Sequence, residues 1–200
     1  MNTESVFILD DTIEFNDNRS KDDFIKISPN VGDKINGSGN IRFEINNQQD
    51  FIILADSFLV CEFSISKGDG TDLGTDDITL ENNFFPRCFN QMSLTIGGRE
   101  IENITECPGE ASTIYNLIAM SDTYKRTYGQ ICGWFPDTGN GNNDVDNIDY
   151  NSGYFWRKKI YNKKNKYTIK FPLKSVFGFT DYNKILYLIK ISISLIRKKW

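Results

Sequence analysis

The chain has 200 residues, of which 39% are hydrophobic, and a formal net charge of -4. That size suits one domain with one sizeable core, and the mild acidity points to neither a nucleic acid nor a membrane as an electrostatic partner. Histidine is absent, which excludes Ser-His-Asp and Cys-His nucleophiles, histidine zinc sites and imidazole acid–base catalysis.

Residues 1–39 are interpreted as an arm or edge segment that precedes the first clear strand. Acidic residues stand within the first 15 positions, where a signal peptide would be basic and then apolar, so we expect a protein that is not secreted. In Asn40–Ile45 the apolar residues Ile41, Phe43 and Ile45 alternate with polar ones, which predicts a strand with one buried face.

A second alternating set lies within residues 51–66 and predicts another strand: Leu59, Cys61, Phe63 and Ile65. Residues 67–77 hold three glycines and four aspartates, a composition typical of a surface loop.

The clearest hairpin follows at residues 91–104. Met92, Leu94 and Ile96 share one face of a predicted strand, and Gly97 and Gly98 come next. Glycine tolerates the positive φ of a two-residue turn, so we expect residues 99–104 to return as the partner strand.

Residues 108–120 predict one short helix, which connects two strands. Pro108 lies at its start and Glu110 in its first turn, while Ile114, Leu117 and Ile118 follow the i, i+3, i+4 spacing of one helix face.

Residues 137–152 are predicted to form a long polar loop, and three strands are predicted after it, at 154–160, 167–173 and 186–196. About eight strands and one helix predict an all-β protein, a jelly-roll sandwich of two antiparallel sheets in one domain over residues 1–200. Three sets of side chains are expected between the sheets: Ile41, Phe43 and Ile45; Met92, Leu94 and Ile96; Ile189, Ile191 and Ile193.

Residues 171–184, FPLKSVFGFTDYNK, are followed by the alternating strand Ile193-Ser-Leu-Ile-Arg197. This stretch resembles the end of the first jelly roll in the double-jelly-roll major capsid proteins of Polinton (Maverick) and adintovirus-type elements. Three upstream segments are in matching order, although their patterns are less specific: Asp10–Glu14, Asn82–Phe89 and Ile96–Glu102.

The resemblance implies two four-stranded sheets standing upright in a trimeric, pseudo-hexagonal capsomer. It implies a structural protein of the virion, made inside the host cell, whose partners are copies of itself and other capsid proteins. Family members continue through a linker into a second jelly roll, which the 200 residues do not contain; a fragment, a truncated copy and a single-jelly-roll relative are all compatible with this.

No residue is assigned to catalysis, a cofactor or a metal, and no small-molecule substrate is expected. The two aspartate-rich loops lack EF-hand spacing and are interpreted as solvated rather than as calcium sites: Asp69, Asp72, Asp76 and Asp77; Asp137, Asp144, Asp146 and Asp149. Four carboxylates after the hairpin are interpreted as an exposed face rather than a glycosidase pair: Glu100, Glu102, Glu106 and Glu110.

A basic run is compatible with weak contact to a packaged genome or with a solvated surface: Arg157, Lys158, Lys159, Lys163, Lys164 and Lys166. The four cysteines form no C-x-x-C pair and are expected to be free thiols: Cys61, Cys88, Cys107 and Cys132. The longest apolar run, residues 185–196, is broken by polar residues, so no membrane span is expected.

The alternative function is a β-sandwich binding module, for example one for carbohydrate, because such folds host both roles. A binding module should gather exposed aromatic side chains on one sheet face or loop rim, whereas a capsid subunit should spread apolar patches over its flanks.

Overall fold

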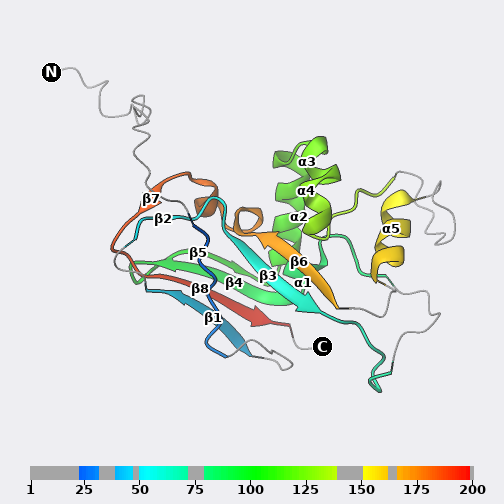
Figure 1. The fold of residues 1–200 in the computed structure, drawn as a ribbon, viewed down its shortest axis with the longest axis horizontal. Helices are drawn as coiled ribbons and strands as arrows, with labels where there is room; N and C mark the ends of the chain where they lie inside the picture. Colours follow the sequence, from blue (N-terminus) through cyan, green and yellow to red (C-terminus); the bar gives the residue numbers. More distant parts are fainter. Residues whose placement is uncertain are drawn as a thin grey trace.

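The computed structural model describes residues 23–31, 39–46, 50–71, 79–138, 151–161 and 166–198. The strands of this part of the chain are β1 (Asn40–Ile45), β2 (Ile52–Ile53), β3 (Phe58–Phe63), β4 (Phe89–Ile96), β5 (Arg99–Thr105), β6 (Tyr167–Pro172), β7 (Ile185–Leu186) and β8 (Ile191–Arg197). Its helices are α1 (Phe84–Arg87), α2 (Pro108–Ala119), α3 (Asp122–Arg126), α4 (Tyr128–Ile131), α5 (Ser152–Tyr161) and the 3-10 turns η2 (Leu173–Ser175) and η3 (Gly178–Asp181) (Figure 1).

The strands pair in a nested order. β1 pairs with β8, β2 with β7, β3 with β6 and β4 with β5, and every pair is antiparallel. A further β4–β8 pairing joins two of these pairs into a four-stranded sheet of order β1-β8-β4-β5. The predicted antiparallel, mostly β architecture is confirmed. In place of a second four-stranded sheet, the described residues form the two-stranded sheets β2-β7 and β3-β6.

The core lies between the four-stranded sheet and the β3-β6 pair. Met92 and Leu94 point from β4 into this space with no exposed surface, and Phe171 of β6 meets them from the other side. The Phe85 ring of α1 lies 5.1 Å from that of Phe171, centroid to centroid. Burying side chains of this size stabilises the fold by roughly 1.5–3 kcal/mol each, which makes this layer the main source of stability.

Six of the nine side chains expected in the core are buried: Ile41, Met92, Leu94, Ile96, Ile191 and Ile193. The other three are half-buried and pack against the same cluster: Phe43, Ile45 and Ile189. The strand β1 is an edge strand with β8 as its one sheet neighbour, which leaves Phe43 and Ile45 partly open to solvent.

Residues 23–31 form neither helix nor strand and lie along one side of the sandwich. The Asn30 amide donates a 2.8 Å hydrogen bond to the Arg42 carbonyl on β1, and the Phe24 ring lies 5.9 Å from that of Phe58 on β3. This segment therefore links the two layers at the edge that β1 leaves open.

The strand predicted at residues 154–160 is wrong, because this segment is the helix α5. Gly153, Arg157 and Tyr161 are its buried residues, and their spacing of four places them on one helix face. The Asn151 side chain accepts a 3.1 Å hydrogen bond from the Tyr154 amide, as an N-cap does. The loop predicted over residues 137–152 lies mostly outside the described residues.

The helix α2 was predicted within one residue of its observed end, but the expectation of a single helix is wrong. The last strand was also predicted too long, because it begins at Ile191 rather than at residue 186. Leu188 has φ 53°, a left-handed conformation that breaks the extended chain between β7 and β8.

The predicted hairpin is confirmed. Gly97 and Gly98 have φ of 59° and 79° and join the paired strands β4 and β5. No atom lies within 4 Å of a Cβ built on Gly98, so backbone conformation alone requires glycine at that position.

Replacing Gly98 with Val should lower the free energy of unfolding by about 1–2 kcal/mol, because a β-branched residue is strained at positive φ. Denaturant unfolding measures the change. Gly39→Val is the matched control, since Gly39 is equally uncrowded and has no positive φ. Equal effects of the two substitutions would contradict the assigned turn.

Candidate functional site

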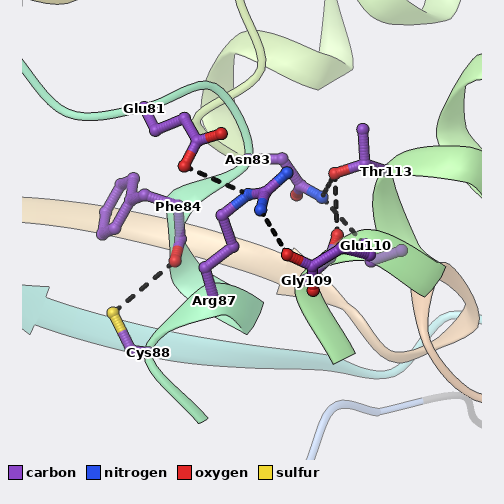
Figure 2. Close-up of polar contacts among 9 residues, drawn as sticks. Glu81, Asn83, Phe84, Arg87, Cys88, Gly109, Glu110 and Thr113 are labelled. Carbon is purple, nitrogen blue, oxygen red and sulfur yellow. Dashed lines mark hydrogen bonds and ion pairs between the residues drawn. The ribbon is translucent and has the colours of Figure 1, made fainter. Parts of the chain in front are cut away.

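The helix α2 is attached to the rest of the fold through polar side chains (Figure 2). Asn83, in a left-handed conformation with φ 57°, is buried and donates from Nδ2 to Ser112 Oγ and Thr113 Oγ1, both at 3.1 Å. Thr113 Oγ1 donates in turn to the Gly109 carbonyl at 2.7 Å. A buried amide is costly unless it is paired, so these bonds fix where α2 lies against the residues before α1.

Arg87 at the end of α1 forms the second attachment. Its NH1 donates to Glu110 Oε1 at 2.6 Å, and its Nε lies 3.3 Å from Glu81 Oε2. The Nε–Glu81 pair lacks hydrogen-bond alignment, so the Glu110 contact is the directional one. A Cβ on Gly109 would come within 3.0 Å of Arg87 Cα, so α1 and α2 approach this closely only because residue 109 has no side chain.

The outward side of α2 is apolar, which reverses the usual arrangement of an amphipathic helix. Ile114 and Leu117 are each 57% exposed and Ile118 is 82% exposed, while Ser112 and Asn116 are buried. We name Ile114, Leu117 and Ile118 the α2 ridge. An amphipathic helix ordinarily turns such a stripe toward the core, and covering these side chains would contribute up to about 1.5–3 kcal/mol each. The exposed α2 ridge therefore indicates a surface that binds a partner.

A second exposed apolar group lies around β7, and we name Ile185, Tyr187 and Leu188 the β7 tip. These side chains are 58%, 49% and 61% exposed. The Tyr187 ring stacks on Phe51, centroid to centroid 4.6 Å. In Figure 1, β7 lies at the left end of the molecule and α2 stands right of its centre, so the two apolar surfaces are separate.

The β4–β5 hairpin and residues 171–184 contact each other. Glu102 on β5 accepts a 2.9 Å hydrogen bond from the Gly178 amide and a second from the Phe179 amide, at the first turn of η3. Tyr115 of α2 donates to Asp181 at the end of η3 at 3.2 Å. The hairpin, α2 and the 171–184 segment are thus joined by side chains from all three.

The two aspartates of the aspartate-rich loops that the structure describes, Asp69 and Asp137, interact with protein groups rather than with each other. Asp69 Oδ1 accepts from the amide and hydroxyl of Thr71, which lowers the pKa of that carboxyl, and Asp137 pairs with Arg157 at 2.9 Å. Over the described ranges, no three His, Cys, Asp or Glu side chains are grouped to hold a metal. Six of the eight aspartates lie outside those ranges: Asp72, Asp76, Asp77, Asp144, Asp146 and Asp149.

The described residues of the basic run do not form one exposed patch. Arg157 is 5% exposed, donates from NH1 to the Phe135 carbonyl at 3.0 Å and pairs through NH2 with Asp137, so it anchors α5. Lys159 lies over the Trp156 ring at 4.8 Å, and Lys166 pairs with Glu62 at 2.7 Å. Lys163 and Lys164 lie outside the described residues.

The four candidate carboxylates are not assembled as an acid–base pair. Glu100 accepts from Asn103 at 3.2 Å, Glu102 caps η3 and Glu110 pairs with Arg87. Glu106 is exposed and has φ 67°, just before α2 begins. Three of these carboxylates thus have structural partners on different segments.

All four cysteines are free thiols, as predicted. Burial raises the pKa of Cys61, of Cys88 and of Cys132, the last to about 11. These three thiols are therefore protonated at neutral pH and are poor nucleophiles. Burial also raises the pKa of Tyr124, which hydrogen-bonds with Cys132, to about 12.

A shallow groove of about 230 Å³ between α4, α5 and β6 has Ile131, Phe135, Tyr161 and Tyr167 on its walls. That volume is below the roughly 300–1,000 Å³ of most small-molecule sites, and none of the described residues that line the groove is charged. The described lining of the groove does not bring charged groups together as a small-molecule site would.

No protein-family model matches the chain, and no curated protein or solved structure matches it either. Within the part of the chain that the structure describes, no helix has the length and apolarity to cross a bilayer.

Replacing Gly109 with Ala should destabilise the protein by about 1–3 kcal/mol, because the added methyl group overlaps Arg87. The sign of the change in unfolding free energy tests the close contact, since a Gly-to-Ala change at an uncrowded helical position stabilises a protein by up to about 1 kcal/mol. Urea unfolding distinguishes the two; a stabilised variant would show that α1 and α2 are not in this close contact.

Replacing Glu102 with Ala should cost about 1–3 kcal/mol, because two backbone amides lose a charged acceptor. Glu100→Ala is the control on the same strand; its carboxylate bonds an exposed side chain, and a change within about 0.5 kcal/mol is expected. Comparable losses in the two variants, measured by thermal unfolding, would refute the capping role of Glu102.

Proposed function

We propose that the chain is a structural capsid protein, the N-terminal jelly roll of a Polinton (Maverick) or adintovirus-type double-jelly-roll major capsid protein, and that it self-associates into capsomers. The nested strand pairing supports the jelly-roll part of the proposal. In a jelly roll a long antiparallel hairpin rolls up, so the first strand pairs with the last, the second with the one before the last, and so on.

The contact between Glu102 and the Gly178–Phe179 amides adds support. Both ends of this contact belong to segments that match the family pattern, and the hydrogen bonds hold these two segments together. The first amides of η3 in residues 171–184 need an acceptor, and Glu102 on β5 supplies it.

The observation that carries the functional proposal is the pair of separate apolar surfaces, the α2 ridge and the β7 tip. Exposed apolar side chains are normal when scattered, but contiguous groups mark interaction sites. Two such surfaces on one small chain suit a subunit with neighbours on more than one side.

The proposed partners are further copies of this chain and other capsid proteins, and the proposed location is the virion. The proposal gives the chain no catalytic step, and it does not use Arg157 for genome contact because that side chain is buried and paired. A genome-facing surface would have to be built from other lysines.

A carbohydrate-binding module is the second candidate. One observation favours it: the exposed rings of Phe51 and Tyr187 lie together at one end of the sandwich. However, the rings stack on each other, so each has a face already covered, which weakens their use as a sugar platform. Calorimetric titration with oligosaccharides tests this candidate, and Tyr187→Ala should abolish any binding that it reports.

Light scattering on the purified chain, over a range of concentrations, tests the capsid proposal. We expect the mass to rise above that of a monomer with concentration and to persist at 1 M salt, because apolar contacts are not screened by salt as ion pairs are. A monodisperse monomer at the highest concentration would refute self-association and favour the binding module.

A further inference from the structure

We propose that the α2 ridge of one copy packs against the β7 tip of a second copy, so that the chain associates head to tail. This inference rests on the proposed self-association and names the surfaces that perform it.

The α2 ridge has acidic ends. Glu110 stands one turn before Ile114 and its side chain is 48% exposed, and Asp122 follows Ile118 with 90% of its side chain exposed. Lys125 is only 13% exposed and directs its ammonium to the Leu117 carbonyl. The ridge is therefore an apolar stripe with a carboxylate beyond each end.

The β7 tip has the opposite charges in the same arrangement. In the sequence Lys184-Ile-Leu-Tyr-Leu-Ile-Lys190, two lysines enclose five apolar residues. Lys184 is exposed and the Lys190 side chain is 51% exposed. Glu110, Asp122 and Lys190 also have partners in their own chain, Arg87, Lys125 and Glu44, so these charges orient the contact between copies, and the apolar side chains supply its strength.

The β7 tip is long enough to cover the α2 ridge. From Ile114 to Ile118 the ridge spans about 6 Å along the helix at 1.5 Å per residue. The six steps from Lys184 to Lys190 span at most about 20 Å when extended, and the left-handed Leu188 shortens that path. The segment between the two lysines is therefore long enough to cover the whole α2 ridge.

Charge disfavours the two symmetric alternatives. If α2 packed antiparallel on α2 of a second copy, Glu110 of each copy would lie near Asp122 of the other, and like charges would meet. If two β7 tips met, lysines would face lysines. The head-to-tail contact pairs opposite charges, and it leaves one unused ridge and one unused tip, so that it continues until a ring closes or a filament forms.

Two polar variants test the contact, each altering one surface. Ile118→Gln keeps a good helix former in α2, and Leu188→Asn places a residue that tolerates left-handed backbone at the tip. Val60→Gln is the control, since Val60 is 59% exposed on β3 and belongs to neither surface. Circular dichroism melting checks that each variant folds, and sedimentation velocity measures association.

We expect each surface variant alone to associate at least tenfold more weakly than the wild type, and the control to match the wild type. An equimolar mixture of the two variants should form a 1:1 heterodimer, because one intact ridge and one intact tip remain between them. That complementation is specific to a contact between two different surfaces.

Wild-type-like association of either surface variant alone, or a mixture that gains no heterodimer, would overturn the head-to-tail contact while leaving self-association in place. A wild type that stays monomeric at every concentration would instead refute the proposed function itself. The variants and their mixture thus test the head-to-tail contact, and the wild type tests self-association, in the same experiment.

Discussion

The orientation of α2 depends on one contact, the close packing of Arg87 on Gly109 with the ion pair to Glu110 beside it. The buried bonds from Asn83 to Ser112 and Thr113 act in the same direction, so the helix is held by its polar side. Because the polar side of α2 faces the rest of the protein, the apolar residues on its other side face solvent. An apolar anchor in place of this polar one would have buried the α2 ridge and removed the feature that most distinguishes the surface.

The sandwich and the helices contribute differently to the protein. The sandwich derives its stability from the apolar layer between β4, β8 and the β3-β6 pair, which Phe85 of α1 also enters, whereas α2 is attached by directional contacts such as Tyr115–Asp181 and Arg87–Glu110. Such contacts fix geometry more than they add stability, since pairs that are partly exposed contribute about 1 kcal/mol or less. The arrangement suits a subunit whose frame is stable alone and whose surfaces are completed by neighbours.

Local patterns in the sequence were sufficient for several of the longer strands and for the hairpin. Period-two alternation located β1, β3 and β4, and the Gly97-Gly98 pair located the turn, because both signals depend on adjacent residues. The helix α5 was missed because Tyr154–Ile160 is rich in aromatic residues typical of strands, while its helical face is marked by a glycine and an arginine. The direction in which α2 faces was not predictable from periodicity, since it is set by Asn83 and Arg87, about 20 to 30 residues away in the sequence.

Hydrogen–deuterium exchange at two protein concentrations is the most direct test that these surfaces are interfaces. At low concentration we expect the amides of α2 and of residues 184–190 to exchange at the rates of the isolated chain. At a concentration where light scattering shows association, both segments should become protected together, with the outer sheet strand β5 unchanged. Protection that appears in β5 alone, or in neither segment despite association, would contradict the account.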